Sequence, residues 1–273
     1  MNRHVFQASI GCFLLIVSVA VAQDRPSGSV RVDELLTRLN NAKLVQADLW
    51  DIESQPPDPR TTTALKNAFG SRTNKNERQW IAATLLRLGK QDSSYFEFLA
   101  GYATEAIEDR VPALLKYDSG GHAIRGEFSP LFEDWCAKNG KDPRKIAAIE
   151  FEDHPADVLV LAQANDGRSR DIFRRGIASP NALVVAYCVQ GLGRLHDSNS
   201  LPLLEQSLER FPSDEQSTIS TELPWFESAE ADRLMARFIP DSGIRKFHHD
   251  NFRRWHEIEL KRVLSRTGVP SAK

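Results

Sequence analysis

The same order of apolar and polar positions occurs three times without a gap, in segments that begin at Asp166, Asp197 and Ser228. The aligned apolar residues are Ile172, Phe173 and Ile177, then Leu203, Leu204 and Leu208, then Leu234, Met235 and Ile239. A spacing of four or five residues returns a side chain to nearly the same side of a helix. The opening Asp or Ser can accept hydrogen bonds from amides of a first helical turn. The pattern predicts three equivalent amphipathic helices whose apolar positions are buried.

A second set of helices is predicted between these segments. Pro180 to Leu195 has an apolar circumference, with Pro180 near the first turn, where a missing amide costs little. Gly193 follows Leu192 and is expected to end this helix. Ser213 to Phe226 occupies the same position in the next unit. The chain is therefore expected to run as helix, turn, helix, and then the next unit.

A more distant copy of this pattern lies upstream. Trp80 to Gly89 aligns with Val184 to Gly193, and Asp92 to Leu99 aligns with Asp197 to Leu204 after one inserted residue. These strings resemble the HEAT-like repeat family, in its short, phycobilisome-lyase type of about 30 residues. The resemblance covers about half of the chain and implies an all-α solenoid of stacked antiparallel helix pairs. It implies no particular activity, because such repeats serve unrelated proteins. The alternative is an ordinary globular helical protein with a coincidental period.

The remaining segments can be divided by composition. The predicted parts are a targeting segment (1–22), an N-terminal helical cap (23–60), HEAT-like repeats (61–110 and 155–241), an irregular insertion with helices (111–154) and a basic C-terminal capping helix (242–273). Val30 to Glu53 predicts one or two amphipathic helices with a break near Asn40. Val111 to Tyr117 is expected to be helical. Asp142 to Phe151 predicts a short helix.

The segment 1–22 has the features of a signal peptide. Arg3 and His4 form a basic start, and Ile10 to Val21 is an apolar core that is short for a membrane span. Small residues at Ala20 and Ala22 favour cleavage before Gln23. The protein is therefore expected to be exported, either periplasmic or secreted, and an uncleaved anchor is the alternative.

Charge is nearly balanced overall but unevenly distributed. The net charge is -2, so no bulk attraction to nucleic acid is expected. Residues 205–241 hold nine acidic and three basic residues, whereas residues 244–273 hold eight basic and three acidic ones. The last helix, Ile244 to Arg266, is expected to cap the acidic end through one apolar face. The residues of that face are Ile244, Phe247, Trp255 and Ile258. Contact of its basic face with a membrane or an anionic partner is the alternative.

The candidate chemistry is weak. His249 and His256 are separated by two helical turns, which is too far for one metal ion on a straight helix. Cys136 and Cys188 are interpreted as buried thiols, with a disulfide as the alternative. We therefore expect no catalytic, metal or cofactor site. The alternative is an enzyme with a site near the Gly120-Gly121 insertion, including His122.

The expected function is a protein-protein interaction or scaffolding module with an unidentified protein partner. Polar residues of the repeat helices are the candidate contacts. These residues are Arg170, Arg174, Arg175, Glu205, Glu209, Arg233 and Arg237. A solvated surface without a partner is the simpler interpretation of such charges. A structural protein of the cell envelope is a further hypothesis.

Overall fold

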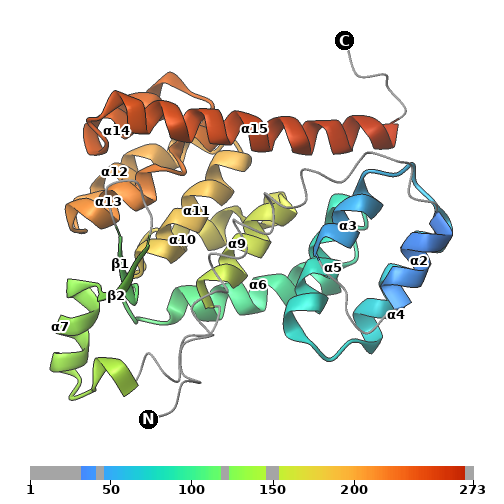
Figure 1. Cartoon of the computed structure of the whole chain (residues 1–273), viewed down its shortest axis with the longest axis horizontal. Helices are drawn as coiled ribbons and strands as arrows, with labels where there is room; N and C mark the ends of the chain where they lie inside the picture. Colours follow the sequence, from blue (N-terminus) through green and yellow to red (C-terminus); the bar gives the residue numbers. More distant parts are fainter. Residues whose placement is uncertain (1–31, 41–45, 118–122, 146–153, 268–273) are drawn as a thin grey trace.

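The computed structural model describes residues 32–40, 46–117, 123–145 and 154–267 (Figure 1). This part of the chain is mostly helical, which confirms the all-α class. The predicted targeting segment, Gly120, Gly121, His122 and most of the predicted helix at 142–151 lie outside the described residues. Among the described helices, none is both long enough and apolar enough to cross a membrane.

The first half of the chain forms five helices that follow one another with short connections. They are α2 (Val32–Asn40), α3 (Gln46–Glu53), α4 (Pro59–Ser71), α5 (Lys75–Arg87) and α6 (Ser93–Glu108). The break predicted near Asn40 is confirmed, because α2 ends there. The side chains of Asp58, Asn74 and Asp92 accept hydrogen bonds from first-turn amides of α4, α5 and α6. Local polar residues therefore set where each of these helices begins.

The second half contains the repeating segments. Its elements are α9 (His154–Ala164), η3 (Gly167–Ser169), α10 (Arg170–Gly176), α11 (Ala182–Arg194), η4 (Ser198–Ser200), α12 (Leu201–Leu208), α13 (Ser213–Ser220), η5 (Leu223–Phe226), α14 (Ala229–Phe238) and α15 (Ser242–Thr267). The three aligned segments become η3 with α10, η4 with α12, and α14. They are thus equivalent helices, as the period predicts.

Burial follows the repeat at eight of its nine aligned apolar positions. The buried residues are Ile172, Phe173, Ile177, Leu204, Leu208, Leu234, Met235 and Ile239. Leu203 is the exception, because 48% of its surface is exposed, and the prediction of its burial is wrong. Its counterparts Ile172 and Leu234 are 9% and 7% exposed, so they lie at the margin of the core. At this margin a small difference in helix position decides whether a side chain is covered.

Helix α11 lies in the middle of the packed helices and contacts α9, α10, α13 and η5 (Figure 1). Gly193 does not end α11 as predicted, because the helix continues to Arg194. A Cβ atom at Gly193 would lie 2.6 Å from the Cβ of Trp225 and 2.8 Å from its carbonyl carbon. The glycine is thus required for the close approach of η5 and not for a turn. The left-handed residue after the helix is His196, with φ of 50°.

The segment from Val111 to Tyr117 is not helical, which corrects the sequence-based prediction. It contains β1 (Leu115–Tyr117), which pairs antiparallel with β2 (Ala123–Phe128), with Leu115 opposite Phe128. Pro112 has no amide hydrogen for a helix, and the partner strand supplies hydrogen bonds instead. Helix α7 (Pro130–Lys138) follows directly. Cys136 of α7 and Cys188 of α11 are both buried and are not joined by a disulfide.

Helix α15 runs back across the molecule from α14 towards α3 (Figure 1). Phe252 packs against Trp225 of η5 with ring centroids 5.0 Å apart, and Trp255 packs against Trp50 of α3 at 6.4 Å. The predicted apolar face is wrong at Phe247, which is 51% exposed. Side chains at positions 252, 255, 259 and 262 recur every three or four residues and form the inner side instead. The helix therefore contacts both halves of the described chain.

Candidate partner-binding surface

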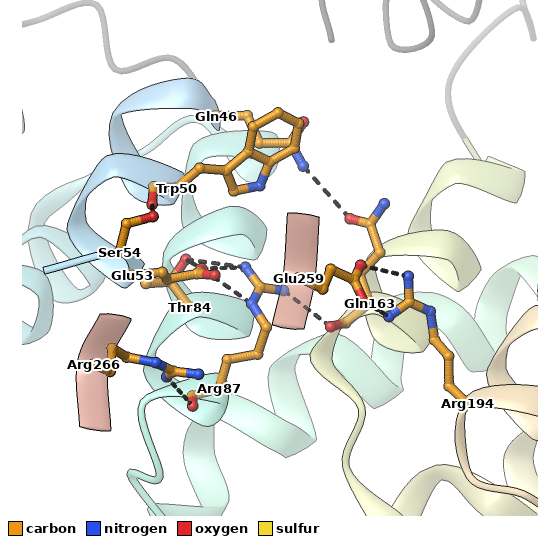
Figure 2. A network of polar contacts seen from close by, with 10 residues as sticks. All are labelled: Gln46, Trp50, Glu53, Ser54, Thr84, Arg87, Gln163, Arg194, Glu259 and Arg266. Atoms are coloured by element: carbon orange, nitrogen blue, oxygen red, sulfur yellow. Dashed lines mark hydrogen bonds and ion pairs between the residues drawn. The ribbon is translucent and has the colours of Figure 1, made fainter. Parts of the chain in front are cut away.

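The densest polar network lies beneath α15 and joins helices from both halves of the chain (Figure 2). Its centre is Glu53, whose Oε1 accepts hydrogen bonds from Thr84 Oγ1 at 2.7 Å and from Arg87 Nη2 at 2.5 Å. Burial works to raise the pKa of Glu53, but the charge and hydrogen bonds of Arg87 and the hydroxyl of Thr84 lower it below its ordinary value. The carboxylate is therefore held ionised inside the protein.

The same network continues to α9, α11 and α15. Arg87 Nη1 donates to the carbonyl of Gln163 at 3.1 Å, and Arg266 Nη1 donates to the carbonyl of Arg87 at 2.7 Å. Arg194 donates to both carboxylate oxygens of Glu259, at 2.9 and 2.8 Å (Figure 2). Its guanidinium also lies 3.8 Å from the ring centroid of Trp225. Glu259 and Arg266 both belong to α15, so these contacts attach α15 to α11 and α5.

Two other carboxyl groups, unlike Glu53, have raised pKa values. Burial raises the pKa of Glu215 to about 7, opposed by the hydroxyl of Ser129, which donates to Oε1 at 2.5 Å. Burial likewise raises the pKa of Glu222 to about 7, opposed by the charge of Arg194 and a hydrogen bond from Trp225 Nε1. Perturbed carboxyls can mark active sites. Glu215 is completely buried, however, and its contact joins α13 to the start of α7, which is a structural position.

Two of the three histidines of α15 lie beside aromatic rings. His248 and Phe247 have ring centroids 5.2 Å apart, and His256 and Phe252 have centroids 5.5 Å apart. His249 Nε2 lies 3.4 Å from Asp232 Oδ1 of α14. Within the described ranges, no group of three His, Cys, Asp or Glu side chains is arranged to hold a metal ion.

Four of the seven predicted contact residues form ion pairs between neighbouring repeat helices. Arg174 of α10 donates from Nε and Nη2 to the two oxygens of Asp197, at 2.9 and 2.8 Å. Arg237 of α14 pairs with Glu205 of α12 and with Glu209 at the C-cap of α12, the second at 2.6 Å. These ion pairs link α10 to the segment that enters α12, and α12 to α14. The three helices consequently form one continuous outward surface, which we call the repeat face.

The other three predicted residues, Arg170, Arg175 and Arg233, are exposed and form no side-chain ion pair within the described part of the chain. Arg233 donates to the carbonyl of Ala229, at 3.3 Å. Leu203 of α12 is also exposed on this face. The repeat face thus offers guanidinium donors together with a large apolar side chain, and such residue types form the centres of protein interfaces.

A pocket of about 210 Å³ opens beside the repeat face, between the C-terminal ends of α6 and α10. Its lining residues are Thr104, Ile107, Glu108, Arg110, Arg175, Ala178 and Ser179. The sequence predicts Arg175 as a contact residue but none of the others. Arg110 lies far from Arg175 in the chain, and no sequence period connects the two. Only the packing of α6 against α10 brings them together.

No protein-family model, no curated protein and no solved structure matches this chain. The HEAT-like resemblance therefore stays a prediction that is based on the repeated residues. The proposed function therefore depends on the residues of the repeat face.

Proposed function

We propose that the protein is an exported HEAT-like repeat protein whose repeat face binds another protein. In this proposal the helix pairs stack as an α-solenoid, and the protein acts as an interaction or scaffolding module without catalysis of its own. The periodic pattern from Asp166 to Ile239 and the equivalence of α10, α12 and α14 support the stacked arrangement. The leader-like segment 1–22 supports export.

The observation that carries the binding proposal is the exposure of Leu203 on the repeat face. A leucine at a position whose two counterparts are buried leaves apolar surface in water, which a partner would cover. Arg174 and Arg237 connect the neighbouring helices through Asp197, Glu205 and Glu209.

Leu203→Glu is expected to weaken partner binding by at least about tenfold, because burial of a leucine contributes roughly 1.5–3 kcal/mol. The unfolding free energy should change by less than about 0.5 kcal/mol, because this side chain is half-exposed. The matched control is Leu260→Glu on α15, where the leucine is also 48% exposed but lies away from the repeat face. Binding would be measured by calorimetry with the partner identified by cross-linking. Equal losses of partner affinity in Leu203→Glu and Leu260→Glu would refute a role for the repeat face.

A further inference from the structure

We infer that the pocket between α6 and α10 accepts a carboxylate group from the protein partner. This inference rests on the proposed function, because the pocket adjoins the repeat face through Arg175. The pocket volume of about 210 Å³ is below the roughly 300–1,000 Å³ of sites for drug-sized ligands. That size suits one acidic side chain or a chain terminus better than a cofactor.

The two arginines of the pocket have guanidinium donors that the described part of the chain does not use. The side chains of Arg110 and Arg175 take part in none of the described hydrogen bonds or ion pairs, whereas those of Arg168, Arg174 and Arg237 are all paired with carboxylates. A guanidinium is always charged and presents a planar set of donors that matches a carboxylate in bidentate geometry. Two such groups in one small pocket favour an anionic ligand.

The helix ends place a favourable partial charge beside the two arginines, which are exposed to water. Helix α6 ends at Glu108 and α10 ends at Gly176, and both ends border the pocket. The C-terminal end of a helix carries a partial negative charge that stabilises a nearby cation. This stabilisation acts on the charge and leaves the N–H donors of Arg110 and Arg175 available to a ligand.

The remaining lining residues favour a single negative charge. Glu108 opposes the two arginines and gives the lining a net charge of about +1, which matches a carboxylate better than a doubly charged phosphate. Thr104 and Ser179 add hydroxyl groups. Ser179 Oγ accepts from the amide of Asn181 at 3.2 Å and keeps its own proton for donation. Ile107 supplies an apolar wall.

The walls of the pocket are closely packed. A Cβ atom at Gly176 would lie 2.2 Å from the Sγ of Cys188 and 3.0 Å from the side chain of Ile107, so α10 approaches its neighbours as closely as a glycine permits. The side chain of Asn181 donates to the carbonyl of Val111 at 3.3 Å and fixes the segment that follows Arg110. The site is therefore formed before a ligand arrives.

The test is a titration of the full chain followed through the Nε–Hε NMR signals of its arginines. The probes are an acetyl-Gly-Glu-Gly-amide peptide, the same peptide with Gln in place of Glu, and sodium succinate. The Glu peptide should shift the signals of Arg110 and Arg175 saturably, and the Gln peptide should not. Arg175→Gln should weaken this binding by at least about tenfold, and Arg175→Lys by a smaller factor, because it keeps the charge but loses the planar donor set.

Arg254→Gln is the matched control, because it removes an exposed arginine of α15 and should leave the titration unchanged. If the Glu and Gln peptides bind equally, or if Arg175→Gln and Arg254→Gln act alike, the carboxylate site is refuted. If succinate binds more tightly than the Glu peptide, the ligand is a free acid and not a protein. That result would overturn the proposal that a protein partner supplies the carboxylate. Failure of Leu203→Glu to weaken partner binding would refute the repeat face and leave this titration unaffected.

Discussion

Replacement of Arg87 by alanine is expected to lower the free energy of unfolding by about 3 kcal/mol. The side chain of Glu53 is only 4% exposed, and Arg87 supplies its closest positive charge. Removal of Arg87 leaves a buried carboxylate with the hydroxyl of Thr84 and the more distant charge of Arg262. It also removes the donor to the carbonyl of Gln163, which joins α5 to α9. Urea unfolding of wild type and Arg87→Ala at neutral pH measures this decrease in unfolding free energy.

The control for this prediction is Arg60→Ala. Arg60 and Asp33 also form an ion pair at 3.0 Å, but their side chains are 60% and 79% exposed. Exposed pairs contribute about 0–1 kcal/mol, so this variant should unfold almost as the parent does. Glu53→Gln in the Arg87→Ala background should restore part of the stability by removing the unpaired charge. If Arg87→Ala and Arg60→Ala lower the unfolding free energy by similar small amounts, the structural role of the network in Figure 2 is contradicted.

Glu215→Gln is expected to flatten the pH dependence of stability above about pH 4.5. Burial raises the pKa of Glu215 from its ordinary value of 4.5 to about 7, so the folded protein holds this proton more tightly than the unfolded chain. This difference in pKa contributes roughly 3 kcal/mol to the free energy of unfolding. The contribution is fully present below the pKa of the unfolded chain and is lost as the pH rises through about 7. The glutamine cannot ionise, and its carbonyl can still accept from Ser129.

Urea unfolding of wild type and Glu215→Gln across this pH range measures the effect, with Glu230→Gln on the exposed side of α14 as the control. Glu222 has a raised pKa as well and contributes in the same direction. The Glu215→Gln variant should therefore lose only part of the pH dependence of its unfolding free energy. Glu53 acts in the opposite direction, because its lowered pKa contributes stability that is lost on acidification. Identical pH profiles for wild type and Glu215→Gln would show that the Glu215 carboxyl does not resist ionisation.

The repeating part of the fold can be predicted because its signal is local. Asp166 and Ser228 cap the first and third repeat segments as predicted, whereas Asp197 makes no cap hydrogen bond and pairs with Arg174 instead. The spacing of apolar residues indicates the buried sides of α10, α12 and α14. The same pattern predicts the upstream helices α5 and α6. These features depend on a few neighbouring residues and need no knowledge of distant contacts.

The differences from the sequence-based prediction depend on long-range packing. Gly193 has the sequence context of a helix end, yet its role is set by Trp225, which belongs to a later element, η5. Leu203 has the same periodic position as Ile172 and Leu234 but is not covered. The inner side of α15 includes Ile244 and Trp255 of the predicted apolar face, but also Phe252 and the charged groups Glu259 and Arg262, which that prediction omits.

The candidate site can be predicted only in part. The arginines of the repeat helices are recognisable as exposed polar positions, but the sequence does not show which of them pair with neighbours. Arg174 and Arg237 are paired, whereas Arg175 lines a pocket. Arg110 enters that pocket from the end of the other predicted repeat block, 61–110. A ligand site built by two distant segments has no periodic signature.

The most direct test of the proposed binding role is site-specific photo-cross-linking in the producing cell, with a photoreactive amino acid at position 203 or at position 260. The proposal predicts one discrete adduct at position 203 and none at position 260, with the captured protein binding the purified chain saturably. Equal adducts at both positions, or no adduct at position 203, would contradict a docking role for the face formed by α10, α12 and α14.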